Sequence, residues 1–144
     1  ANLKGYCLEQ SGADQRKDAW KCVANQTIYD PCFTIPNTNP QKLICPNSPW
    51  EAQATLLQVQ GSLDNSSHAE LDMSTSPPWA LELLDGTRCL ILTEKHTHQG
   101  ETLSYYCNGN RYLLGRLKRC YNFWQIYLRD GPNFHLVKIK RAWF

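Results

Sequence analysis

The sequence has no long apolar segment and no recognisable catalytic motif. No apolar run reaches the roughly 18 residues that a membrane-spanning helix needs. No serine lies in a nucleophile elbow, and neither His-Glu-x-x-His nor a phosphate-binding glycine loop occurs. We therefore expect a protein that is not an enzyme, and a hydrolase with an unrecognised site is the last alternative. The acid–base side chains without a diagnostic neighbourhood are His68, His96, His98, His135, Asp30, Asp72, Glu82 and Asp85.

The spacing Cys-x-x-Cys is also absent, although the chain of 144 residues contains seven cysteines. This absence argues against a zinc-ribbon knuckle and against a thioredoxin-like redox pair, so structural disulfides are the better interpretation. A cysteine count this high is typical of an oxidising compartment. Together with a start that lacks an initiator methionine, it predicts an exported protein, secreted or periplasmic, whose signal peptide has been removed.

The pairing of the cysteines is not fixed by sequence, but short loops and the strand pattern described below favour three pairs. Each pair closes a loop of about 13 to 18 residues, for which the chain-entropy model gives about 3 kcal/mol of stabilisation. The expected pairs are Cys7 with Cys22, Cys32 with Cys45, and Cys89 with Cys107. Cys120 is then a free thiol, either buried and inert or exposed and able to pair with another chain.

Residues 1–50 contain five prolines, all after position 30. Because each proline removes a backbone donor and cannot sit inside a long helix, we expect an irregular segment held together by disulfides. A short helix is expected only over residues 14–23.

From residue 54 apolar and polar residues alternate, first over 55–63, which is typical of half-buried strands. Six further strands are expected in three hairpins, because three segments contain residues that tolerate positive φ. These turns are Asp85-Gly86, Asn108-Gly109-Asn110 and Asp130-Gly131-Pro132-Asn133. The prediction is one all-β domain over 1–144: an irregular segment over 1–50, and over 54–144 an antiparallel meander of about seven strands, as a small barrel or a sandwich.

Several of these features occur in one order along the chain. They are Cys7, Cys22, Asp30-Pro31-Cys32-Phe33, Cys45-Pro46, Pro78-Trp79-Ala80-Leu81-Glu82-Leu83, Asp85-Gly86-Thr87-Arg88-Cys89, Tyr106-Cys107, Trp124 and Ala142-Trp143. In this order the chain resembles, over nearly its whole length, a family of small exported bacterial proteins best known from actinobacteria. The resemblance implies an exported protein with paired cysteines and no established activity. The chain departs from the family's pattern at 93–100, where a short glycine-rich turn is usual, and at Cys120.

Positive charge is concentrated near the end of the chain. Residues 105–144 contain eight basic residues and one acid, whereas residues 1–104 contain seven basic and twelve acidic residues. Alternate side chains of a strand share a face, so Arg116 and Lys118 form a patch with Lys138 and Lys140 if their two strands are close. The predicted basic face comprises Arg116, Lys118, Arg119, Lys138, Lys140 and Arg141.

A basic face of this kind fits an anionic ligand, such as an acidic glycan, a lipid head group or another polyanion. The alternatives are a solvated strand face, a guarded sheet edge, or an internal match to the acidic part of the chain. We expect a monomer that binds without catalysis. The second functional class is an interaction or inhibitor module that contacts a host or secreted protein through the polar stretch 64–78.

One set of side chains resembles a metal site. Glu94, His96 and His98 share one face of an extended segment and could offer a carboxylate and two imidazoles to zinc or copper. A fourth ligand is not evident, and a polar turn explains the segment equally well. No cofactor is therefore expected.

Overall fold

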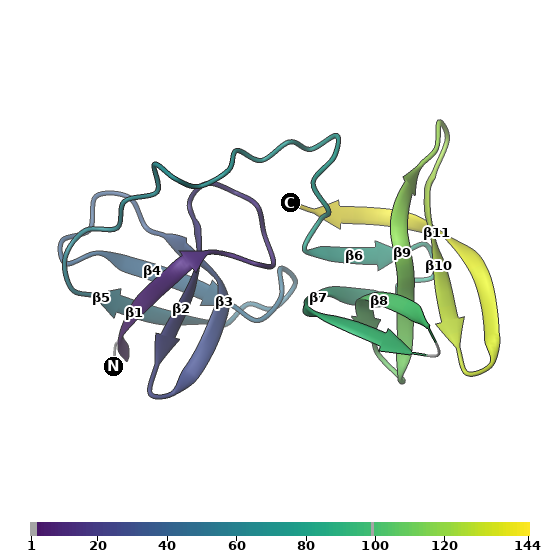
Figure 1. Ribbon diagram of the computed structural model, residues 1–144, viewed down its shortest axis with the longest axis horizontal. Helices are drawn as coiled ribbons and strands as arrows, with labels where there is room; N and C mark the ends of the chain where they lie inside the picture. Colours follow the sequence, from purple (N-terminus) through teal and green to yellow (C-terminus); the bar gives the residue numbers. More distant parts are fainter. Residues whose placement is uncertain (1–2, 99) are drawn as a thin grey trace. The chain divides into compact units, whose positions relative to one another are not determined.

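The computed structural model describes residues 3–98 and 100–144, apart from the side chain of His98. The described residues form eleven strands and no helix, so the predicted all-β class is confirmed (Figure 1). The strands are β1 Leu3–Gln10, β2 Ala19–Ala24, β3 Thr27–Thr34, β4 Lys42–Pro46, β5 Ala54–Val59, β6 Ala80–Leu83, β7 Arg88–His98, β8 Glu101–Cys107, β9 Arg111–Arg119, β10 Trp124–Asp130 and β11 Asn133–Trp143.

The strands belong to two compact units, Ala1–Ser76 and Pro77–Phe144. Each unit contains one closed barrel, formed by β1 to β5 in the first and by β6 to β11 in the second. The boundary falls inside the polar stretch 64–78. One domain over 1–144 stays a prediction, which unfolding experiments can test.

In the first unit, β1 to β5 follow one another around the barrel, and β1 closes it by pairing with both β2 and β5. The β1–β5 pair is parallel, from Leu3 opposite Leu57 to Gly5 opposite Val59, and the remaining pairs are antiparallel. Apolar side chains from alternate strand positions fill the interior. The buried cluster consists of Trp20, Cys22, Ala24, Cys32, Leu43, Cys45, Leu57 and Val59.

The prediction of an irregular segment over 1–50 is wrong, because this segment carries β1 to β4. These four strands account for the difference between the expected seven and the observed eleven. Two of the prolines fit into the sheet at positions that tolerate them. Pro31 lies where the register between β2 and β3 shifts, and Pro46 ends β4. Proline is tolerated at such irregularities since no ladder hydrogen bond from its nitrogen is needed there.

The short helix expected over 14–23 is also wrong. Ser11 Oγ accepts hydrogen bonds from the backbone N–H groups of Ala13 and Asp14, and Asp14 Oδ1 accepts one from the N–H of Arg16. Such side-chain-to-backbone bonds hold a turn that competes with a helix. The residues that follow form β2, which pairs with β1 and β3.

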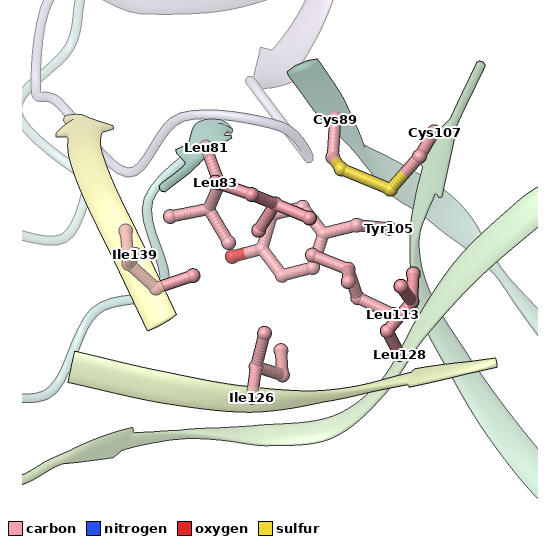
Figure 2. Close-up of a cluster of buried hydrophobic side chains, with 9 residues drawn as sticks. All are labelled: Leu81, Leu83, Cys89, Tyr105, Cys107, Leu113, Ile126, Leu128 and Ile139. Atoms are coloured by element: carbon pink, nitrogen blue, oxygen red, sulfur yellow. A yellow bond between two sulfur atoms is a disulfide. The ribbon is translucent and has the colours of Figure 1, made fainter. Parts of the chain in front are cut away.

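In the second unit, β6 to β11 form a closed barrel rather than a sandwich, since β11 pairs with both β10 and β6. The three predicted hairpin turns are confirmed, with φ of 91° at Gly86, 78° at Gly109 and 60° at Gly131. Figure 2 shows the side chains that fill this barrel. They are Leu81, Leu83, Cys89, Tyr105, Cys107, Leu113, Ile126, Leu128 and Ile139.

The described cysteines form three disulfides, and their pairing is the one favoured by the sequence. Each disulfide joins neighbouring strands of one barrel. The bonds are Cys7–Cys22 between β1 and β2, Cys32–Cys45 between β3 and β4, and Cys89–Cys107 between β7 and β8. Cys120 is free and exposed, directly after β9, so the expectation that it is buried is wrong. Three disulfides in a chain of this size are typical of an oxidising, extracytoplasmic environment.

Candidate functional site

The two basic runs lie on strands that are separated by one strand. β10 pairs with β9 on one side and with β11 on the other, and Gln125 of β10 lies opposite both Lys118 and Lys138. Directly opposed residues point to the same face of a sheet. Lys118, Gln125 and Lys138 therefore form one transverse row, which we call the lysine row. Its two lysines are two strand spacings apart, about 10 Å at the backbone.

Both lysines of the row lie close to aromatic rings. Lys118 Nζ is 5.4 Å from the ring centroid of Tyr127, and Lys138 Nζ is 4.3 Å from that of Phe123. A cation held near a ring face keeps its charge accessible while its side chain loses some freedom. The lysine row is thus a partly ordered pair of positive charges.

The other residues of the predicted basic face do not join this row. The Arg119 guanidinium carbon is 4.7 Å from the Trp124 ring centroid, and Trp124 packs against the core of the barrel. Arg141 Nε lies 3.9 Å from an oxygen of Glu82, which is itself buried. Two register irregularities explain the remainder. Arg116 and Lys140 are exposed, and each lies where the pairing of its strand shifts, between Gln125 and Tyr127 of β10 and between Ile139 and Arg141 of β11 respectively.

A second feature of this face was missed at the sequence level: aromatic and apolar side chains cover it beside the lysine row. In one row, β9 to β11 contribute Tyr112, Arg129 and Phe134, which lie opposite one another. In the next row, β8 to β11 contribute Leu103, Leu114, Tyr127 and Leu136. We call these two rows the ring face. The alternation Gln125, Tyr127, Arg129 around buried Ile126 and Leu128 was the available signal.

The ring face is partly exposed and hollowed. Tyr127 is 45% exposed and Phe134 is 46% exposed, values that are high for large rings on a barrel. Two adjacent hollows of about 480 and 510 Å³ lie on it, within the range usual for small-molecule sites. Phe134 lines both. The first is also lined by His96, Thr97, Leu103, Asn110, Tyr112 and Arg129, and the second by Glu101, Thr102, Leu114, Gly115 and Tyr127.

The proposed metal set lies at the edge of this region. The segment that was interpreted as a polar turn continues β7 as far as His98, with His96 opposite Leu103 and His98 opposite Glu101. The register shifts between Ile91 and His96, so Glu94 lies within that irregularity. No three His, Cys, Asp or Glu residues within 3–98 and 100–144 are placed to hold a metal ion. The His98 side chain lies outside the described residues, and the metal set stays a prediction.

The acid–base candidates of the first unit hold its loops. Asp30 accepts hydrogen bonds from the Ser11 hydroxyl and from the Gly12 N–H at 3.0 Å, and burial raises the pKa of its carboxyl above the ordinary value despite these bonds. His68 Nδ1 lies 2.8 Å from the carbonyl oxygen of Lys17, and its ring packs on Trp20 at 4.1 Å between centroids.

Asp85 belongs to the first hairpin turn of the second unit. It accepts a hydrogen bond from the N–H of Thr87 at 2.9 Å, which lowers the pKa of the Asp85 carboxyl. Its position is therefore explained by the turn itself, as expected from the sequence Asp85-Gly86.

Within the residues that the structure describes, no helix has the length and apolarity to cross a membrane. The chain matches no protein-family model, no curated protein and no solved structure.

Proposed function

We propose that this chain is an exported bacterial protein that binds an anionic ligand, without catalysis, through the lysine row of its second barrel. The observation that carries the proposal is the alignment of Lys118 and Lys138 on either side of Gln125. Sulfate, carboxylate and phosphate groups share the charge that such a row attracts. A glycan, a lipid head group or another polyanion can supply that charge.

The distribution of charge supports this proposal. The second unit contains ten basic and five acidic residues, a net charge of +5, whereas the first contains five basic and eight acidic residues, a net charge of −3. A positive field on one barrel raises the rate at which an anion meets it. The rings of Tyr127 and Phe123 reduce the freedom that the lysines lose on binding, which lowers the entropic cost of the complex.

The proposal is tested by retention of the protein on immobilised heparin across a salt series. Lys118→Glu and Lys138→Glu each change the net charge by the same amount as Lys4→Glu, an exposed lysine of the first unit that serves as the matched control. We expect either row variant to elute at clearly lower salt than the control, because each loses one ionic contact and reduces the salt dependence by about one ion.

Equal elution of the three variants would contradict the role of the lysine row. Low-salt elution of the unsubstituted protein would contradict anion binding altogether. Binding to vesicles that contain phosphatidylglycerol, compared with heparin, separates a lipid head group from a glycan as the source of the charge.

A further inference from the structure

The ring face beside the lysine row bears on which anionic ligand the protein binds. Exposed rings, hollows and cations occur on the same strands, β9 to β11, so a ligand that reaches the lysine row also reaches the rings. Resting on the proposed function, we infer that the ligand is an acidic oligosaccharide that lies across the ring face, with its sugar rings stacked on Phe134 and Tyr127.

The shape and lining of the hollows suit sugar rings. The apolar C–H face of a pyranose packs against an aromatic side chain, and Phe134 lies where the two hollows meet. Each hollow also has neutral polar side chains at its rim, Thr97 and Asn110 in the first and Thr102 in the second. Hydroxyl and amide groups of this kind orient a ligand by hydrogen bonds to its own hydroxyls.

The charges of the ring face favour a ligand with widely spaced anionic groups. Among the described residues that line the hollows, Arg129 is the one permanent cation and Glu101 the one carboxylate. The guanidinium of Arg129 lies 5.9 Å from the ring centroid of Phe134, so one acidic group of a stacked sugar falls within its reach. A second acidic group can reach the lysine row.

Single-stranded nucleic acid is the competing occupant, because bases also stack on aromatic side chains. It carries one phosphate for every base, and a groove that tracks such a chain is lined by cations along its length. Here Glu101 lies in the second hollow, where it would repel a phosphate chain. The mixture of sparse cations, neutral polar groups and one acid therefore fits a sugar chain with intermittent acids better.

The test measures the affinities of the full chain for four probes by titration calorimetry. Hyaluronan oligosaccharides carry rings and alternating carboxylates, and their methyl-esterified forms keep the rings without the charge. Polyphosphate carries charge without rings, and oligothymidylate carries phosphates and bases. We expect hyaluronan oligosaccharides to bind more tightly than the other three.

Two substitutions assign this preference to the ring face. Phe134→Ala weakens hyaluronan binding about tenfold through the lost ring contact and leaves polyphosphate binding unchanged, because no charge is altered. Glu101→Gln strengthens hyaluronan binding, because it removes the repelling carboxylate. Tyr6→Ala is the matched control, since Tyr6 is an exposed ring of the first unit and 59% exposed.

The outcomes separate this inference from the proposed function. If polyphosphate binds as tightly as hyaluronan, or Phe134→Ala leaves hyaluronan binding unchanged, the sugar-stacking inference is overturned while anion binding stands. Tighter binding of oligothymidylate, or equal binding of the methyl esters, also overturns it. If none of the anionic probes binds, both proposals fail together.

Discussion

Asp14 is the most deeply buried carboxyl group of the first unit, with 2% of its surface exposed. Burial raises the pKa of this carboxyl above its ordinary value of 3.8, against the hydrogen bond from the Arg16 N–H and the charge of Arg16. A carboxyl whose pKa is raised on folding binds more protons in the folded state than in the unfolded chain. The ionised form of Asp14 therefore destabilises the fold at neutral pH.

Asp14→Asn is expected to increase the free energy of unfolding at pH 7 by about 1 kcal/mol, because a buried amide costs less than a buried carboxylate. Oδ1 of the asparagine can still accept the bond from Arg16. The unsubstituted protein gains stability as pH falls through the raised pKa of Asp14, so the difference between the two proteins disappears in acid. Urea unfolding of both proteins across this pH range measures the difference.

Asp30 provides the contrast to Asp14. The pKa of its carboxyl is also raised by burial, but both of its oxygens accept hydrogen bonds, from Ser11 and from Gly12. An asparagine has one acceptor oxygen in place of two, so Asp30→Asn loses one of these bonds and should not stabilise. A stabilising effect of Asp30→Asn, or no effect of Asp14→Asn at any pH, would contradict this account of the buried carboxyls.

At the scale of elements, the closure of the first barrel depends on how closely β1 approaches β2. A methyl group on Gly5 would collide with the carbonyl oxygen of Val23 and lie 3.0 Å from the Cβ of Ala24. The same glycine lies opposite Val59 at the parallel junction of β1 and β5. Glycine is required here for a close backbone approach and not for a turn.

Gly5→Ala is therefore expected to lower the free energy of unfolding by about 1–3 kcal/mol, as an overpacked position must displace its neighbours. Amide exchange should increase in β1 and β5, because displacement of β1 weakens the junction that closes the barrel. Lys4→Ala, at the preceding exposed position, is the control and should change stability by less than about 0.5 kcal/mol. Unchanged protection of β5 in Gly5→Ala would show that the barrel closes without this contact.

The accuracy of the sequence-based predictions differs between the two ends of the chain for physical reasons. The hairpins around Gly86, Gly109 and Gly131 were predictable, because positive φ at a glycine and alternating strands are local signals. Strands β1 to β4 were not, because their prolines were interpreted as breaks although Pro31 occupies a register shift that only the paired strands reveal.

The site was predictable only in part for a similar reason. Alternation along single strands indicated which basic residues share a face, but the sequence does not show which strand lies between two others. The placement of β10 between β9 and β11 brings Tyr127 and Phe134 beside the lysine row. Arg119 and Arg141 contact Trp124 and Glu82 instead, a separation that the spacing of the basic runs does not contain.

At the scale of the whole molecule, each unit has the features of an independently stable body. Each has a closed barrel and its own buried cluster, and the two clusters share no residue. Two disulfides lie in the first unit and one in the second. Units of about 70 residues have small cores, and disulfides commonly add stability at this size.

This organisation predicts two unfolding transitions in calorimetry, where a single domain over 1–144 predicts one. Ile126→Ala removes a fully buried side chain from the second barrel and should cost about 2–5 kcal/mol there. Only one transition should then move to lower temperature, and amide exchange should increase in β6 to β11 alone. Leu43→Ala, at a fully buried position of the first barrel, should shift the other transition. If either substitution shifts one common transition, the chain unfolds as one domain.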